Sequence, residues 1–102
     1  MQWPRNRDEF LDIVDQTIFE VDDLVASAAD EGDEDDLGQY VPVYQQIATR
    51  LRVLRQDVLD GRHRFADGTD LEVLTFSARW KAHIPVFSLL ETLNAAHRRG
   101  VE

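Results

Sequence analysis

Cysteine is absent from the sequence, and within 102 residues proline occurs three times, glycine five times and lysine once. The lack of cysteine excludes disulfide bonds, thiolate metal ligands and a cysteine nucleophile, and it is compatible with a reducing compartment. No apolar run approaches the roughly 20 residues of a membrane-spanning helix. The first ten residues, MQWPRNRDEF, also lack the apolar segment of a signal peptide. We therefore expect a cytoplasmic protein without membrane contact.

The sequence contains enough apolar residues for one hydrophobic core. Apolar residues make up 43% and charged residues 30% of the chain, a composition typical of ordered proteins. A chain of this length buries roughly two thirds of the surface that it exposes when unfolded. We therefore predict a single domain over residues 1–102.

Apolar residues recur at spacings of three and four, which is typical of helices with one buried face. The pattern predicts helices at about 6–29, 42–60, 70–83 and 85–99, with an acidic loop over 30–38. The fold class is thus all-α, a small antiparallel bundle of three to four helices. The predicted core faces of the first two helices are Phe10, Val14, Thr17, Ile18, Val21, Val25 and Ala28, and Tyr40, Tyr44, Ile47, Leu51, Leu54 and Val58.

The ends of these helices carry typical boundary residues. Asn6 with Glu9, and Thr69 with Glu72, have the spacing of capping boxes at the starts of the first and third helices. Pro85 cannot continue a helix, because its ring clashes with the preceding turn. The last two helices are therefore separate, or they form one rod kinked at Pro85.

Negative charge is concentrated in the first third of the chain. Residues 1–36 carry 13 acidic side chains against two arginines, a net charge of −11, and residues 37–102 carry seven acidic against nine basic side chains, a net charge of +2. The densest run is DEGDEDD, at residues 30–36. Adaptation to salt would spread acidic residues over every exposed face, so the concentration favours a local electrostatic role.

The acidic run does not match a calcium-binding loop. When Gly38 is placed at the sixth position of the twelve-residue motif, Leu37 and Tyr44 occupy positions that require oxygen ligands. The three histidines lack the spacing of a zinc site, and His97 is predicted to be a hydrogen-bonded residue at the edge of the core. We expect no metal and no cofactor.

Basic and aromatic residues meet in the loop 61–69, where RHRF occupies 62–65. As an alternative to a loop, this stretch could pair with residues 71–76 in a β-hairpin, although the alternation of polar and apolar residues breaks after Phe76. It could also bind a phosphate or stack on a base. Since a net charge of −9 opposes binding to a polyanion, we expect no nucleic-acid partner, and the arginines then neutralise acidic residues of the protein itself.

One enzymatic hypothesis rests on carboxylates at helical spacing. Asp8, Glu9 and Asp12 imitate half of the metal-binding pattern of all-helical, magnesium-dependent nucleotide pyrophosphatases, and Asp57 with Asp60 imitates the other half. The first group, however, is predicted to face away from the apolar side of its helix. With no phosphate-binding glycine loop or serine nucleophile in the sequence, we expect that the protein is not an enzyme.

A protein-interaction module is the favoured hypothesis. Phe19 is predicted to lie among carboxylates on the outer face of the first helix, which suggests a binding surface for a basic partner. Inhibitors, immunity proteins, antitoxins and adaptors have this character. The predicted partner-binding residues are Asp12, Asp15, Phe19, Asp22 and Asp23.

The third predicted helix is apolar on two sides, as if it lay between two layers. Leu71, Leu74, Ala78 and Ala82 form one side. The other side can pack against the first or the fourth predicted helix, but a second copy of the chain serves equally, and we expect a homodimer formed through it. Its residues are Val73, Phe76, Trp80 and Ile84.

Overall fold

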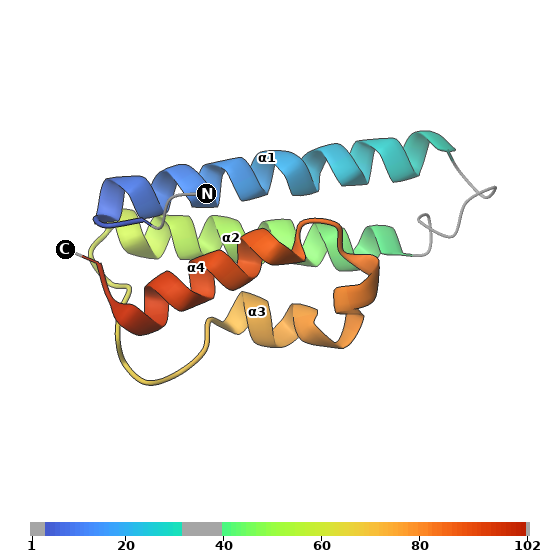
Figure 1. Cartoon of the computed structure of the whole chain (residues 1–102). Helices are drawn as coiled ribbons and strands as arrows, with labels where there is room; N and C mark the ends of the chain where they lie inside the picture. The colour runs from blue at the N-terminus through green and yellow to red at the C-terminus, as the bar shows by residue number, and fades with distance from the viewer. Residues whose placement is uncertain (1–3, 32–39, 102) are drawn as a thin grey trace.

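A computed structural model describes residues 4–31 and 40–101, which form four α-helices and one 3₁₀ helix and contain no strand. These elements are α1 (Arg7–Glu31), α2 (Val41–Leu59), α3 (Glu72–Ser77), the 3₁₀ helix η3 (Ala78–His83) and α4 (Phe87–Arg99). Successive α-helices run in opposite directions (Figure 1). The predicted all-α antiparallel bundle is confirmed, and the alternative of a hairpin between residues 62–65 and 71–76 is not formed.

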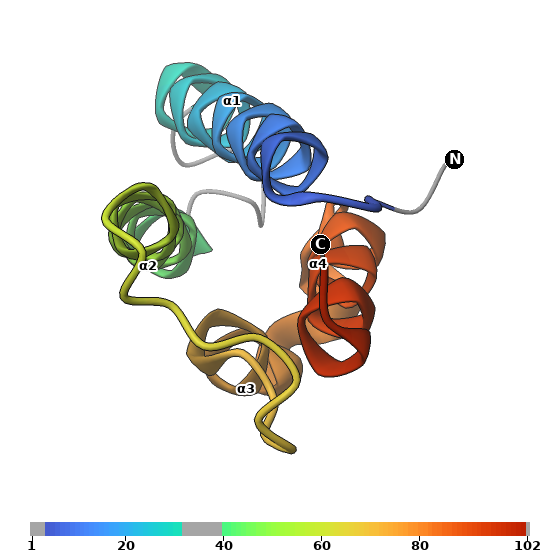
Figure 2. The ribbon, with the colours of Figure 1, turned by 90° about the vertical axis from the view of Figure 1, so that its left-hand side faces the viewer.

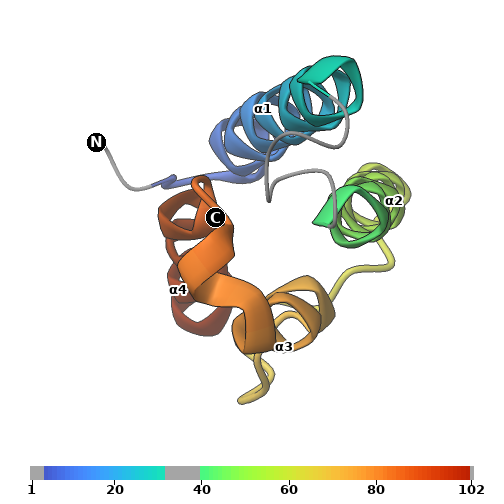
Figure 3. The same cartoon turned by 90° about the vertical axis from the view of Figure 1, so that its right-hand side faces the viewer.

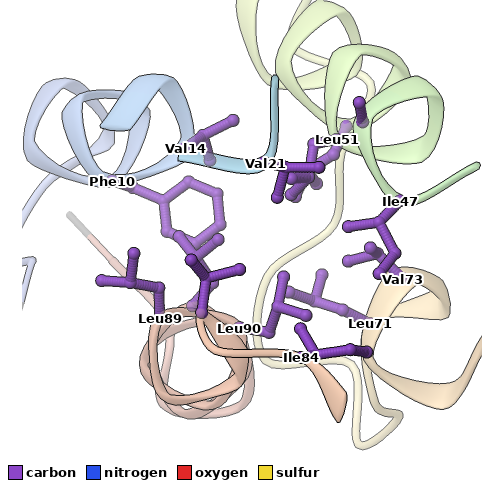
Figure 4. Close-up of a cluster of buried hydrophobic side chains, with 14 of the residues drawn as sticks. Phe10, Val14, Val21, Ile47, Leu51, Leu71, Val73, Ile84, Leu89 and Leu90 are labelled. Atoms are coloured by element: carbon purple, nitrogen blue, oxygen red, sulfur yellow. The ribbon is translucent and has the colours of Figure 1, made fainter. Parts of the chain in front are cut away.

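Seen along the helix axes, the helices form a ring in the order α1, α2, α3, α4, in which α4 closes against α1 (Figure 2, Figure 3). Their apolar sides meet in the middle of the ring (Figure 4). The core includes Phe10, Val14 and Val21 of α1, Tyr44, Ile47 and Leu51 of α2, Leu71, Val73 and Ile84 around α3 and η3, and Leu89, Leu90 and Leu93 of α4. The two predicted core faces of α1 and α2 therefore pack against each other and against α4 and α3.

The start of α1 follows the predicted cap in part. The Glu9 N–H donates to Asn6 Oδ1 at 2.9 Å, as expected for an N-cap asparagine. The Glu9 carboxylate accepts from the Arg5 N–H at 2.8 Å rather than from Asn6. Asn6 therefore caps the helix without the reciprocal bond of a capping box.

The far end of α1 lies beyond the predicted one. The helix continues to Glu31, two residues into the predicted acidic loop 30–38. The remainder of that loop falls in residues 32–39, outside the described part of the chain, and so does most of the rejected calcium motif.

The third predicted helix, 70–83, is divided in the structure. The α-helical part ends at Ser77, and the chain tightens into η3, within which Trp80 leaves helical geometry (φ −116°, ψ 18°). Ile84 is then extended (φ −116°, ψ 99°), as is typical of a residue before proline. The chain reverses here, so that α4 runs back along α3, and the single kinked rod is excluded (Figure 1).

The predicted capping box of this helix is wrong. The Thr69 N–H and hydroxyl both donate to Asp67 Oδ1, at 3.0 and 2.7 Å, and Glu72 instead accepts from Arg50. The N–H of Leu71, the residue that precedes α3, donates to Asn94 Oδ1 of α4 at 2.7 Å. The side chain of Asn94, 23 residues away in sequence, therefore accepts a hydrogen bond that a local cap residue was expected to accept.

Candidate functional site

The acidic face of α1 is defined here as Asp8, Asp12, Asp15, Phe19, Asp22 and Asp23. At about 100° per residue, the five aspartates lie within about 60° of Phe19 around the helix. Phe19 is 74% exposed, the largest exposed fraction among the described large apolar side chains. The five predicted partner-binding residues thus lie on one outward surface, with the Phe19 ring at its centre. They are Asp12, Asp15, Phe19, Asp22 and Asp23.

One edge of this face is paired with α2. Arg55 Nε lies 2.6 Å from Asp15 Oδ1, and Arg52 Nη2 lies 2.5 Å from Asp22 Oδ2. All four side chains are about half exposed, so the pairs contribute little to stability. They connect two carboxylates of the acidic face to α2.

The other edge carries charge without a partner. Within residues 4–31 and 40–101, Asp12 and Asp23 on this edge make no ion pair and no side-chain hydrogen bond. The same holds for Asp8, which lies between Phe19 and Asp15 around the helix, and all three are exposed. Cations of a second molecule can approach these carboxylates without displacing an arginine of the chain. This edge is therefore the part of the acidic face with the greatest capacity to bind positive charge.

The predicted dimer surface is divided between core and exterior. Val73 and Ile84 are 3% and 4% exposed and pack inside the bundle, where they cannot reach a second copy. Phe76 and Trp80 are partly exposed, with ring centroids 5.2 Å apart. The guanidinium carbon of Arg50 lies 3.9 Å from the centroid of the Phe76 ring, in a cation–π contact.

A groove lies between α2 and α3 beside this aromatic pair. Its cavity of about 310 Å³ has Val53, Leu54, Leu71 and Val73 as its apolar lining and Thr49, Arg50, Asp57, His63 and Glu72 as its polar lining. Val53 is 57% exposed on α2. The sequence pattern did not indicate Val53, because an isolated exposed valine has no distinctive spacing.

The carboxylates of the enzymatic hypothesis do not converge. Among the described residues, no three His, Asp or Glu side chains are grouped so that they could hold a metal ion. Asp8 and Asp12 belong to the outward acidic face, whereas Asp57 and Asp60 pair with Arg62 at 3.4 and 2.9 Å. No helix in the same part of the chain is long and apolar enough to cross a membrane.

His97 is a buried, hydrogen-bonded residue, as predicted, and its partner is His63 of the basic loop. His97 is 2% exposed, and its Nδ1 lies 3.0 Å from His63 Nε2. The His63 ring also stacks with Phe10 and contacts the edge of Phe65, at centroid distances of 6.3 and 4.7 Å. No local sequence pattern indicates this pair, because 34 residues separate the two histidines.

The geometry defines the protein as a small antiparallel four-helix bundle with an acidic outer face. No family model, no curated protein and no solved structure matches the chain.

Proposed function

We propose that the protein is a small acidic interaction module that captures a basic protein partner through the acidic face of α1. The observation that carries the proposal is Phe19, 74% exposed at the centre of that face. An exposed aromatic ring surrounded by charge is typical of a binding surface, where the ring fills an apolar pocket and the charges select the partner. The complementary surface has arginines or lysines around a pocket that accepts a phenyl ring.

The two edges of the face support different parts of this function. The pairs of Asp15 with Arg55 and of Asp22 with Arg52 order the side nearest α2. Asp12 and Asp23, on the side away from these pairs, supply the charge that attracts a basic partner and increases its association rate. An acidic surface of this kind suits an inhibitor, an immunity protein, an antitoxin or an adaptor. A cytoplasmic location is part of the proposal, because a chain without cysteine suits a reducing compartment.

Self-association through α2 and α3 is the second part of the proposal. Phe76 and Trp80 remain partly exposed beside the groove that Val53 lines. In the ring of helices, α3 lies opposite α1 (Figure 2). Two copies that meet at α2 and α3 therefore keep their acidic faces apart, which limits the repulsion between them.

Light scattering at low micromolar concentration tests self-association. The expected result is a species heavier than the 11.8 kDa chain, which becomes lighter in a Trp80→Ala variant. Glu91→Ala, a change at an exposed position on α4, is the matched control and leaves the mass unchanged. A wild-type monomer would contradict this part of the proposal and leave the capture of a basic partner untouched.

Affinity purification from native cells, followed by mass spectrometry, tests the main proposal. The tagged wild-type chain is expected to retain a basic protein that is lost with Phe19→Ala and with Asp12→Lys combined with Asp23→Lys. Glu91→Lys reverses the charge of an exposed carboxylate outside the acidic face, and this control variant should retain the partner. Retention that is equal for all variants would contradict a role of the acidic face, and circular dichroism confirms that each variant is folded.

A further inference from the structure

His97 connects the end of α4 to the loop between α2 and α3 at three points. Its ring meets the His63 ring, its carbonyl oxygen accepts from the Ala66 N–H at 2.6 Å, and its Nε2 lies 2.9 Å from the Thr69 oxygen. Phe10 of α1 covers the same loop, with its ring 5.0 Å from that of Phe65. His97 therefore holds a loop against α4, and the same loop also packs against α1 through Phe65 and Phe10.

The acceptors around His97 assign the hydrogen on its ring. Nε2 faces the Thr69 carbonyl oxygen and, at 3.3 Å, Asp67 Oδ1. A carbonyl cannot donate, and hydrogen bonds from Thr69 lower the pKa of Asp67, so that its carboxyl is ionised at neutral pH. His97 Nε2 must therefore carry the hydrogen, which leaves Nδ1 as an acceptor for the Nε2–H of His63.

This arrangement accommodates one proton but not two. His63 Nδ1 makes no hydrogen bond to the described part of the chain, so a first proton bound there leaves the bond between the rings intact. A second proton must occupy His97 Nδ1, the atom that accepts from His63. It removes that bond and leaves two cationic rings with centroids 4.9 Å apart.

We propose that His63 and His97 form a proton-sensitive latch, which holds residues 60–71 against α4 and α1 and opens when both rings are protonated. Opening releases Phe65 from Phe10 and uncovers apolar surface at this end of the bundle. Of the acidic face of α1, Asp8 lines a cavity with His63, whereas the proposed capture of a partner depends on Phe19, Asp12 and Asp23. Acidification thus exposes apolar surface at this end of the bundle, while α1 and α2 stay folded.

The surrounding charges determine the direction of the response. Burial, followed by the neighbouring His97, lowers the pKa of His63 below its ordinary value of 6.5, while Asp57 and Asp67 oppose this shift. Other charged groups also lie near the pair. Arg7 and Asp8 of α1 line a second cavity with His63, and Arg50 of α2 and Glu72 of α3 line the groove with it. Asp70 and Arg98 form an ion pair close to His97. His63 therefore binds a proton less readily in the folded protein than in the unfolded chain. Its neutral ring contributes its full stabilisation of the fold above the ordinary pKa of 6.5, and this stabilisation is lost as the pH falls through the lowered pKa of the folded protein.

Amide hydrogen exchange at Ala66 reports directly on the latch, since this N–H donates to His97. After correction for intrinsic exchange, we expect its protection to fall about tenfold or more, the effect of one pKa unit, between about pH 7.5 and about pH 5. Amides of α1 and α2 should keep their protection. Nitrogen chemical shifts at neutral pH should show both rings protonated at Nε2, and a hydrogen on His97 Nδ1 would overturn the proposal.

His63→Gln isolates the protonation step. The glutamine amide donates to neutral His97 and, after turning over, accepts from protonated His97, so the loop stays attached at both pH values. We expect the change in Ala66 protection to shrink to less than about threefold, under half of one pKa unit. His83→Gln, at an exposed histidine that stacks on Tyr40, is the matched control and should behave as the wild type.

Three results of the exchange measurements would also overturn the latch. The first is Ala66 protection that does not change with pH in the wild type. The second is an equal loss of protection in the wild type and in His63→Gln. The third is simultaneous loss in α1 and α2, which would indicate that acid unfolds the whole bundle rather than opening the loop.

Discussion

The two halves of the bundle are built by different means. The helices α1 and α2 are 25 and 19 residues long, and repeated apolar side chains hold them together along their length. The helix α3 and the 3₁₀ helix η3 have six residues each, and polar bonds from distant residues hold their ends. These bonds include Asn94 to the Leu71 N–H and the Tyr44 hydroxyl to the His83 oxygen. The half formed by α1 and α2 therefore depends on apolar packing, whereas the half that contains α3 and η3 depends also on a few long-range polar contacts.

The largest expected effect is in the first half. Ile47 of α2 is fully buried in the core, and Ile47→Ala should lower the free energy of unfolding by about 2–5 kcal/mol. Chemical denaturation followed by circular dichroism measures this loss. Val53→Ala, at a position that is 57% exposed on the same helix, should change it by less than about 0.5 kcal/mol. Equal losses for the two variants would contradict the packing of α2.

A smaller and more local effect is expected in the second half. Asn94→Ala leaves the buried N–H of Leu71 without an acceptor, which costs about 1–3 kcal/mol. Hydrogen exchange should accelerate in α3 and η3 more than in α1 and α2. Gln56→Ala removes an exposed amide that donates to Asp60, and it serves as the control with little effect. Uniform acceleration over the whole bundle would contradict the contrast between the halves.

The same contrast explains which features the sequence could predict. The apolar periodicity of α1 and α2 is a local pattern, and it predicted both helices to within about two residues, the usual precision of helix boundaries. For residues 70–84, the pattern predicted two apolar sides, but it left open whether Val73 and Ile84 face other helices of the chain or a second copy. Only the packing of the other helices shows that they face the core of the same chain.

The candidate sites likewise contain features that could be predicted from the sequence and features that could not. The grouping of Phe19 with the aspartates of α1 follows from helical spacing and could be predicted. The pairing of Asp15 and Asp22 with arginines of α2 depends on how the two helices are rotated against each other, which spacing does not determine. The contact between His63 and His97 also required the path of the loop, since it joins residues from opposite ends of the second half.

The smallest expected effect concerns the ion pairs that connect α1 to α2. A double-mutant cycle of Asp15→Ala and Arg55→Ala should give a coupling of about 0–1 kcal/mol, because both side chains are about half exposed. Thermal unfolding at low and high salt measures it, and the coupling should decrease with salt. A coupling above about 2 kcal/mol, beyond the range of exposed pairs, would show that this edge of the acidic face stabilises the bundle.

The most direct measurement for the central claim is the dissociation constant of the captured basic partner, determined at several salt concentrations. Salt is expected to weaken binding of the partner to the wild type. Asp12→Lys combined with Asp23→Lys is expected to weaken binding by at least about tenfold, equivalent to about 1.4 kcal/mol. A dissociation constant that is unaffected by salt and by the double charge reversal would contradict the claim that the acidic face of α1 captures the partner.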